Sequence, residues 1–304
     1  MARLYAFQSA PNLVGANADH TWSLSPSELE ATAFALASRL GISTPASRTS
    51  VPEKAIDALS ADLLRSVGRS IIVAGDGATP ATHAVCHAMN NVLGNVGRTV
   101  RYIEPMDADQ ALCIDSITSL AQDIKSNGVD ALLIIGGNPA YDAPADLGFS
   151  ELLKSVKHTW HLSEYDDETS AQCLWHLPAA HYLESWGDAR AYDGTVSIVQ
   201  PLIQPLFDGK SAIELLTALA GKPQQGLAYV QETHRTEGGA SDERWQNILN
   251  KGVVPNSKAA EATVSLQEMN LEAMAPGNGI VAVFAPDPTI WDGSHSNNGW
   301  QQEL

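Results

Sequence analysis

The alternation of short apolar runs with helical patterns over residues 70–162 constrains the fold of this chain more than any other feature. Four apolar runs read as strands, at residues 71–74, 99–103, 131–135 and 159–162. The stretches between them read as helices, at residues 80–93, 109–127 and 146–156. Consecutive βα units need right-handed crossovers and a mostly parallel sheet covered on both faces. The pattern therefore predicts an α/β fold with a Rossmann-like, doubly wound sheet in three layers.

Two helices are predicted before the first of these strands. Ser25 and Glu28 form a capping box around Pro26, and apolar residues then recur at helical spacing up to Gly41. Ser50 and Glu53 predict a second capping box. An apolar stripe follows it, formed by Ile56, Leu59, Leu63 and Val67. Residues 1–69 are thus expected to be the helical part of an α/β domain that spans residues 1–221.

The pattern is less regular towards the C-terminal end. The pair Asp193 and Gly194 is a two-residue hairpin signal, so we expect an edge hairpin that carries Trp186, Arg190 and Tyr192 towards one end. Residues 222–278 are predicted to form a mostly helical or irregular excursion, with a helix at residues 242–250. Residues 279–304 are predicted to hold a strand at residues 280–285 that joins a sheet begun earlier, and then a tail.

Charge and composition limit the possible partners. The chain has 18 basic and 35 acidic residues, which gives a formal net charge of −17. Nucleic acids and anionic membrane surfaces bind proteins through clustered Lys and Arg, so neither is expected to bind this acidic chain. The sequence also has no run of about 18 apolar residues that would insert into a membrane. Cys86, Cys113 and Cys173 have no CxxC spacing, so we expect no iron-sulfur cluster on this chain.

Ligands bind beyond the carboxyl ends of the strands in a parallel sheet. The residues that directly follow two of the predicted strands are therefore candidates for ligand binding. Gly75, Gly77 and Thr79 stand where backbone N–H groups could approach a phosphate at a helix N-terminus. A tight turn with an N-capped helix is the alternative, and Pro80 favours it by standing at the last glycine of a GxGxxG pattern. Gly137 and Asn138 end a later strand in the same way, and they either meet a ligand or shape a buried turn.

Two further groups have competing explanations. The carboxylates Glu164, Asp166, Asp167 and Glu168 either serve a site for acid and base chemistry or a hard cation, or they cap the next helix. His83 and His87 have a spacing that can ligate zinc, but no third ligand is near them in sequence. A polar stripe or a pair of satisfied imidazoles is the favoured explanation for them. We predict no catalytic residue and no metal ligand.

Four sequence landmarks carry a resemblance to a known family. Residues 177–203 read LPAAHYLESWGDARAYDGTVSIVQPLI, residues 136–139 read GGNP, residues 165–169 read YDDET, and residues 297–300 read NNGW. With these landmarks the chain resembles the molybdopterin oxidoreductase superfamily, and within it the large iron-sulfur and molybdopterin-like subunit of bacterial alternative complex III, a quinol oxidoreductase. That family has residues before and after the matching segments, so the resemblance implies a piece of a larger subunit with a missing downstream domain.

The resemblance also implies a cofactor region. In cofactor-bearing relatives the turn similar to residues 136–139 lies near the guanine nucleotide of the pterin cofactor, and the stretch similar to residues 184–190 passes near the cofactor cavity. A vestigial or pterin-nucleotide site would then use Gly75, Gly77, Thr79, Gly137, Asn138, Glu184, Asp188 and Arg190. An internal ion pair between Glu184 and Arg190 is the alternative explanation for those two residues.

Two functional hypotheses remain. The favoured one is a cofactor-free structural and partner-binding module at the periplasmic face of a bacterial inner-membrane respiratory complex. Its partners would be other segments of the same subunit, which carry the iron-sulfur clusters, and other subunits. The alternative is part of a catalytic molybdenum oxidoreductase that binds molybdopterin guanine dinucleotide.

Overall fold

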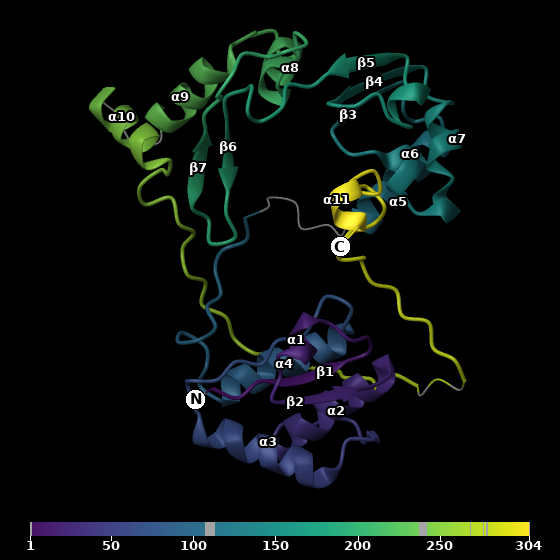
Figure 1. Ribbon diagram of the computed structural model, residues 1–304, viewed down its shortest axis with the longest axis vertical. Coiled ribbons are helices and arrows are strands. Elements are labelled where there is room, and N and C mark those ends of the chain that lie inside the picture. Colours follow the sequence, from purple (N-terminus) through teal and green to yellow (C-terminus); the bar gives the residue numbers. More distant parts are fainter. Residues whose placement is uncertain are drawn as a thin grey trace. The chain divides into compact units, whose positions relative to one another are not determined.

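The computed structural model describes residues 2–106, 113–236, 242–267, 269–275, 277 and 279–303, and it divides into two compact units (Figure 1). Unit 1 comprises Met1–Ile103 and Glu261–Pro288, and unit 2 comprises Glu104–Ala260 and Thr289–Leu304. The predicted α/β class is confirmed, because helices alternate with parallel strands along the chain. The domain boundaries at residues 221 and 278 stay a prediction.

Unit 1 holds a short parallel ribbon and a layer of helices. Its strands β1 (Tyr5–Gln8) and β2 (His20–Ser23) pair in parallel, and α1 (Leu13–Ala16) connects them. Three longer helices follow: α2 (Pro26–Arg39), α3 (Glu53–Arg65) and α4 (Pro80–Val92). Helix α2 packs against both α3 and α4, and the three helices enclose a core that includes Phe34, Leu59 and Met89.

Local signals explain where these helices begin. The capping box of α2 is confirmed: the Ser25 N–H donates to the Glu28 carboxylate at 3.0 Å, and the Glu28 N–H donates to the Ser25 hydroxyl at 3.4 Å. The box predicted for α3 is wrong, because Pro52 is its N-cap residue and the Ser50 hydroxyl instead interacts with Glu28. The apolar stripe of α3 is buried as predicted, except for Val67, which lies beyond the end of the helix and is half exposed.

Two strands predicted in unit 1 are not formed. Residues 71–74 are extended but have no ladder partner among the described residues, and the side chain of Asn90 binds both the N–H and the carbonyl of Ile72 instead. Residues 99–103 make only isolated bridges, between Val96 and Val100 and between Ile103 and Glu261. Of the four predicted runs, only residues 131–135 and 159–162 pair in one parallel sheet among the described residues, and β1 and β2 form a second parallel sheet.

Unit 2 contains the longer parallel sheet. Strands β3 (Ala131–Ile135), β4 (His158–Ser163) and β5 (Trp175–Pro178) lie side by side in that order, with Trp160 paired to both Leu133 and Trp175. The predictions for β3 and β4 are confirmed. Helix α5 (Cys113–Lys125) precedes β3, and the start of its predicted range, residues 109–112, lies outside the described residues.

The helix predicted at residues 146–156 is replaced by two shorter segments, the 3-10 turn η1 (Ala145–Leu147) and helix α7 (Phe149–Leu153). The short helix α6 (Pro139–Asp142) precedes them. Gly148 separates η1 from α7 with a left-handed φ of 62°, which a continuous helix does not allow. Together with α5, these segments bury Phe149 and Ile124 in a small core.

The predicted hairpin is present, but its turn is longer than expected. Strands β6 (Gly187–Arg190) and β7 (Val196–Val199) pair antiparallel as a separate two-stranded sheet. The Ala191 N–H still bonds the Thr195 carbonyl, so the connection is three residues rather than two. Gly194 takes the left-handed position with φ 85°, as in three-residue loops that end in a bulge.

The remaining helical segments include three that form a third core together with the hairpin. The 3-10 turn η2 (Ser170–Gln172) leads into β5, and α8 (Ala212–Leu219), α9 (Gly226–Thr236), α10 (Asp242–Lys251) and α11 (Gly299–Gln302) follow the hairpin. The predicted helix at 242–250 is thus confirmed as α10, and its Trp245 packs with Ile198 and Val230 in this core. The strand predicted at residues 280–285 is not formed: these residues make no ladder with any described strand.

Candidate functional site

The carboxyl edge of the β3–β4–β5 sheet gathers the polar residues that the sequence placed there. The turn at residues 136–139 follows β3, and the acidic loop at residues 164–169 follows β4. Because the strands are parallel and neighbouring, their ends lie at one edge, and the turn and the loop meet. The prediction that both lie at the carboxyl edge of a parallel sheet is confirmed.

Asn138 joins the turn to the loop. Its Oδ1 accepts a hydrogen bond from the Thr169 hydroxyl at 2.7 Å and from the Thr169 N–H at 3.2 Å, and its Nδ2 donates to the Glu168 carboxylate at 2.7 Å. The Thr169 hydroxyl in turn accepts from the Ala140 N–H at 3.0 Å. The polar atoms of Asn138 are therefore used within the protein, and Thr169 is fully buried.

A buried histidine holds the other side of the same turn. His161 on β4 places Nε2 3.1 Å from the carbonyl oxygen of Gly137 and Nδ1 2.8 Å from the Ser170 hydroxyl. A carbonyl only accepts, so the Nε2–H of His161 donates to Gly137. The Ser170 hydroxyl also lies 2.8 Å from Nδ1 of His176. His161 and Ser170 are both buried, so the chain of bonds orders the turn and does not expose a nucleophile.

The acidic loop is largely a cap, which was one of the two explanations offered for it. The Asp167 carboxylate accepts from the N–H groups of Thr169 at 3.1 Å and Ser170 at 2.9 Å, at the start of η2. Burial raises the pKa of the nearby Cys173 thiol, and the negative charge of Asp167 raises it further. Among the side chains that the structure describes, no three His, Cys, Asp or Glu residues converge as a metal site.

The glycine turns leave their backbones open. Gly136 and Gly137 have φ of 64° and 67°, which favours glycine, and a Cβ added at Gly136 would meet no atom within 4 Å. Gly75 and Gly77 in unit 1 are equally unobstructed. Thr79 is the N-cap of α4, its hydroxyl accepting from the Thr82 N–H at 3.2 Å, and it also donates to the Glu30 carboxylate. The tight-turn and N-cap explanation therefore accounts for Thr79.

The three site residues of the stretch 177–203 have separate environments. Glu184 accepts from the N–H groups of His181 and Leu206, each at 3.4 Å. Asp188 on β6 pairs with the buried His234 of α9, with 2.8 Å between Oδ2 and Nε2. Arg190 is exposed, and within the described part of the chain it forms no ion pair with Glu184. The alternative explanation of an ion pair between Glu184 and Arg190 is therefore not supported, because the Glu184 carboxylate accepts from the loop backbone.

Trp186 precedes β6 and contacts one of the cores of unit 2. It is half buried, and it packs against the core that contains Val196, Val230 and Trp245. The backbone of α9 comes close to it at Gly226, where an added Cβ would lie 3.2 Å from the Trp186 carbonyl oxygen. Trp186 therefore contributes to the packing of unit 2, whereas Tyr192 at the hairpin turn is fully exposed.

His87 has a simple structural partner. Its Nδ1 lies 2.7 Å from the Tyr102 hydroxyl, and its ring lies against the Tyr102 ring. The explanation of a satisfied imidazole therefore fits His87.

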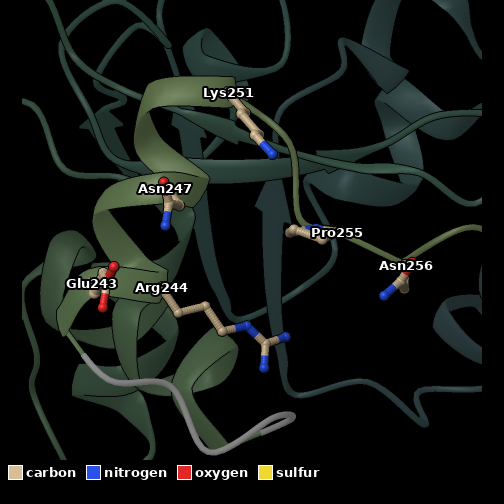
Figure 2. Close-up of a pocket in the computed structure, with 6 residues that line it drawn as sticks. All are labelled: Glu243, Arg244, Asn247, Lys251, Pro255 and Asn256. Atoms are coloured by element: carbon tan, nitrogen blue, oxygen red, sulfur yellow. The ribbon is translucent and has the colours of Figure 1, made fainter.

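Two cavities were missed by the sequence reasoning. One of about 500 Å³ lies over α10, as Figure 2 shows, and it is lined by Glu243, Arg244, Asn247, Lys251, Pro255 and Asn256. The four-residue spacing of Glu243, Asn247 and Lys251 was the available signal, because it places them on one face of a helix. The other cavity, of about 1000 Å³, lies in unit 1 between β1 and residues 69–75. Neither cavity is lined by the turn at residues 136–139.

An exposed apolar loop follows the hairpin. This loop, here called the apolar loop, has three largely exposed side chains and the half-exposed Ile203; the three are Leu202, Leu206 and Phe207. Its backbone is nevertheless fixed: the N–H groups of Leu202 and Ile203 donate to the Leu183 carbonyl, and the Leu206 N–H donates to Glu184. Glu184 thus positions this loop, a role that the sequence did not indicate.

Comparison with known proteins relates part of the chain to a described subunit. No family model matches the sequence. The chain is similar to the menaquinone reductase, molybdopterin-binding-like subunit of Nitratidesulfovibrio vulgaris, with 30% identity over 198 residues. The match covers 58% of this chain and 28% of that protein, so the chain spans little more than a quarter of the length of the relative. The similarity supports a molybdopterin oxidoreductase-like relationship. No helix among the described residues is long and apolar enough to cross a membrane.

Proposed function

We propose that this chain is part of a quinone-linked respiratory oxidoreductase subunit, in which it serves as a cofactor-free module that binds partner subunits. The similarity to a molybdopterin-binding-like subunit of a menaquinone reductase supports the connection with quinone-linked electron transfer. The landmarks at residues 136–139, 165–169, 177–203 and 297–300 add the resemblance to alternative complex III. We place the module at the periplasmic face of the inner membrane, with iron-sulfur clusters in other segments of the subunit.

The observation that carries the partner-binding role is the apolar loop. Large apolar side chains exposed together are a feature of interaction sites on soluble proteins. Here they stand on a backbone held by hydrogen bonds to Leu183 and Glu184, so little conformational entropy is lost when a partner covers them. The loop therefore has both the apolar surface and the fixed geometry that an interface needs.

The hydrogen bonds of Asn138 support the cofactor-free part of the proposal. A nucleotide is usually recognised by a few well-placed polar groups. At this edge the side chain of Asn138 is already bonded to Glu168 and Thr169, and the Gly137 carbonyl to His161. A guanine nucleotide would have to break these bonds before it could use the same groups.

The second candidate function is binding of molybdopterin guanine dinucleotide. The open space over Gly136 and over Gly75 and Gly77 favours it, because backbone could approach a phosphate there without obstruction. In this reading the glycine turns would hold the nucleotide, and the bound group would supply its own redox chemistry.

Assembly of the respiratory complex tests the proposal. Leu202→Ser and Phe207→Ser remove exposed side chains of the apolar loop, and Leu13→Ser is the matched control, since Leu13 is 83% exposed and Leu202 77% exposed. The subunit carrying each variant is expressed in its native host, and its recovery with the detergent-solubilised complex is measured. We expect the loop variants to bind at least about tenfold more weakly, as central interface residues do. Equal recovery of all three variants, each folded by circular dichroism, would contradict the proposal.

A further inference from the structure

The cavity of about 1000 Å³ in unit 1 is lined by two unbroken runs of residues. Consecutive residues 2–8, which include β1, line it from one side, and consecutive residues 69–75 line it from another. Apolar side chains of the helix layer also line it, among them Leu29, Leu36, Leu63 and Met89. The cavity is open to solvent on one side, and lining residues such as Ile71 and Val73 are 56% and 75% exposed. Apolar surface that is left accessible in this way is available to an occupant.

The lining pattern indicates that the edges of the two segments, and not their faces, border the cavity. Successive residues of an extended chain point their side chains to opposite faces, so an unbroken run of lining residues implies that the backbone itself is exposed to the space. Strand β1 has β2 on one edge, and the described residues place no strand on its other edge.

The segment at residues 71–74 shows the same one-sided pairing. The Asn90 side chain binds the N–H of Ile72 at 3.0 Å and its carbonyl at 2.7 Å. Asn90 does not line the cavity, and backbone groups alternate along an extended chain, so those of Ile71 and Val73 point away from Asn90. Two open backbone edges therefore border one apolar space, which is the arrangement left when a sheet lacks a strand.

Residues 280–285 have the sequence of such a strand. They read Ile-Val-Ala-Val-Phe-Ala, a continuous apolar run rich in residues that favour strands. Strands buried on both faces have runs of this kind. In the structure they lie outside any described sheet, with Ile280 103% and Phe284 94% exposed. The exposure of Ile280 and Phe284 is unfavourable, because full burial of a side chain of this size gains about 1.5–3 kcal/mol.

The chain before this run is anchored beside the cavity. The Met274 N–H donates to the Glu30 carboxylate at 2.6 Å, and the other oxygen of that carboxylate accepts from the Thr79 hydroxyl. Thr79 follows shortly after the segment 71–74, so this anchor lies at the carboxyl end of that segment. Residues 275–279 can span at most about 17 Å, which allows residue 280 to enter the cavity from this end. A strand entering there runs antiparallel to residues 71–74.

We propose that the cavity of unit 1 is a strand-binding slot and that residues 280–285 of this chain are its occupant. Inserted between β1 and residues 71–74, they complete a four-stranded sheet with β2 and cover the apolar helix layer. The hydrogen bonds form between the open backbone edges and the inserted strand, as in other additions of a strand to a sheet edge.

Hydrogen exchange and a matched pair of substitutions on the whole chain test this inference. The amides of residues 280–285 should exchange at least about a hundredfold more slowly than in an unstructured peptide, as amides that open with a cooperative unit do. Val283→Asp should lower the melting temperature of unit 1 and abolish this protection. Val264→Asp should do neither, since Val264 is 49% exposed and Val283 47% exposed in the same unit. Val283→Ala should give a smaller loss in the same direction.

Three outcomes would overturn the inference. The first is free exchange of residues 280–285 in the folded chain. The second is equal melting of the Val283→Asp and Val264→Asp variants. The third is protection that appears only at high protein concentration with a dimeric sedimentation coefficient, because the slot would then be filled by the segment of a second copy.

Discussion

Replacing Asn138 by alanine should destabilise unit 2 by about 2 kcal/mol. The substitution removes the acceptor of the Thr169 hydroxyl, and Thr169 is fully buried. A buried donor without a partner costs about 1–3 kcal/mol, and the exposed bond to Glu168 adds about 0.5 kcal/mol. The Thr169 N–H also loses Asn138 as an acceptor, but it still donates to Asp167, so this change adds little to the loss of stability.

The assay is urea unfolding followed by tryptophan fluorescence. Six of the seven tryptophans lie in unit 2, and two of them, Trp160 and Trp175, pair across β4 and β5 beside the turn, so the signal reports this unit. Asn247→Ala is the matched control, because Asn247 is exposed on α10 of the same unit and such surface changes stay within about 0.5 kcal/mol. If Asn138→Ala and Asn247→Ala unfold at the same urea concentration, the argument that Asn138 ties the turn to the acidic loop is refuted.

Three further predictions concern other parts of the chain. Trp186→Ala should lower the free energy of unfolding in urea by about 2 kcal/mol, because Trp186 packs on the core of unit 2. This loss is below the range for a fully buried tryptophan, since Trp186 is only partly buried. An unchanged unfolding midpoint would show that Trp186 does not contribute to the core. The hydrogen bonds from Tyr5 and Arg3 lower the pKa of Asp62 from 3.8 to about 2, so the stabilisation by Asp62 is present above pH 4 and is lost as the pH falls towards 2. Asp62→Asn should remove that part of the acid dependence of thermal melting, and an identical pH profile would count against the network. Burial raises the pKa of Cys86 to about 11, so iodoacetamide at pH 8 should modify the Cys86 peptide only after unit 1 unfolds, as mass mapping can show.

Sequence reasoning succeeded where a local signal was sufficient. The capping box at Ser25 and Glu28 fixed the start of α2, and glycine stop signals placed the ends of α2 and α4 within a few residues. The apolar runs at residues 131–135 and 159–162 became neighbouring parallel strands, so the meeting of the turn at 136–139 with the acidic loop could be predicted.

The failures all depended on long-range partners. Residues 71–74 have the composition of a strand, but a ladder needs a neighbour, and Asn90 supplies the hydrogen bonds of Ile72 instead. The capping role of Ser50 was lost because its hydroxyl met Glu28 from another helix. Glu184 turned to the loop backbone rather than to Arg190, a choice between two nearby partners that residue type does not decide.

The different environments of Trp186 and Tyr192 could not be predicted from the sequence either. Trp186 and Tyr192 stand six residues apart in one feature-rich stretch, yet the first packs on a core and the second is exposed. Their difference comes from α9, whose backbone covers Trp186 at Gly226. Nothing in the local pattern of residues 177–203 indicates that this later helix returns to the hairpin.

Elemental analysis of the full-length subunit, purified from its native source, tests the central claim most directly. The claim has two parts. The sheet edge that contains Gly137, Asn138 and Thr169 is stabilised by hydrogen bonds within the protein. The module to which it belongs binds partner subunits and no pterin cofactor. We expect molybdenum and tungsten to be far below one equivalent per subunit, with no pterin released on oxidation. One equivalent of either metal, together with a pterin guanine dinucleotide, would contradict the account.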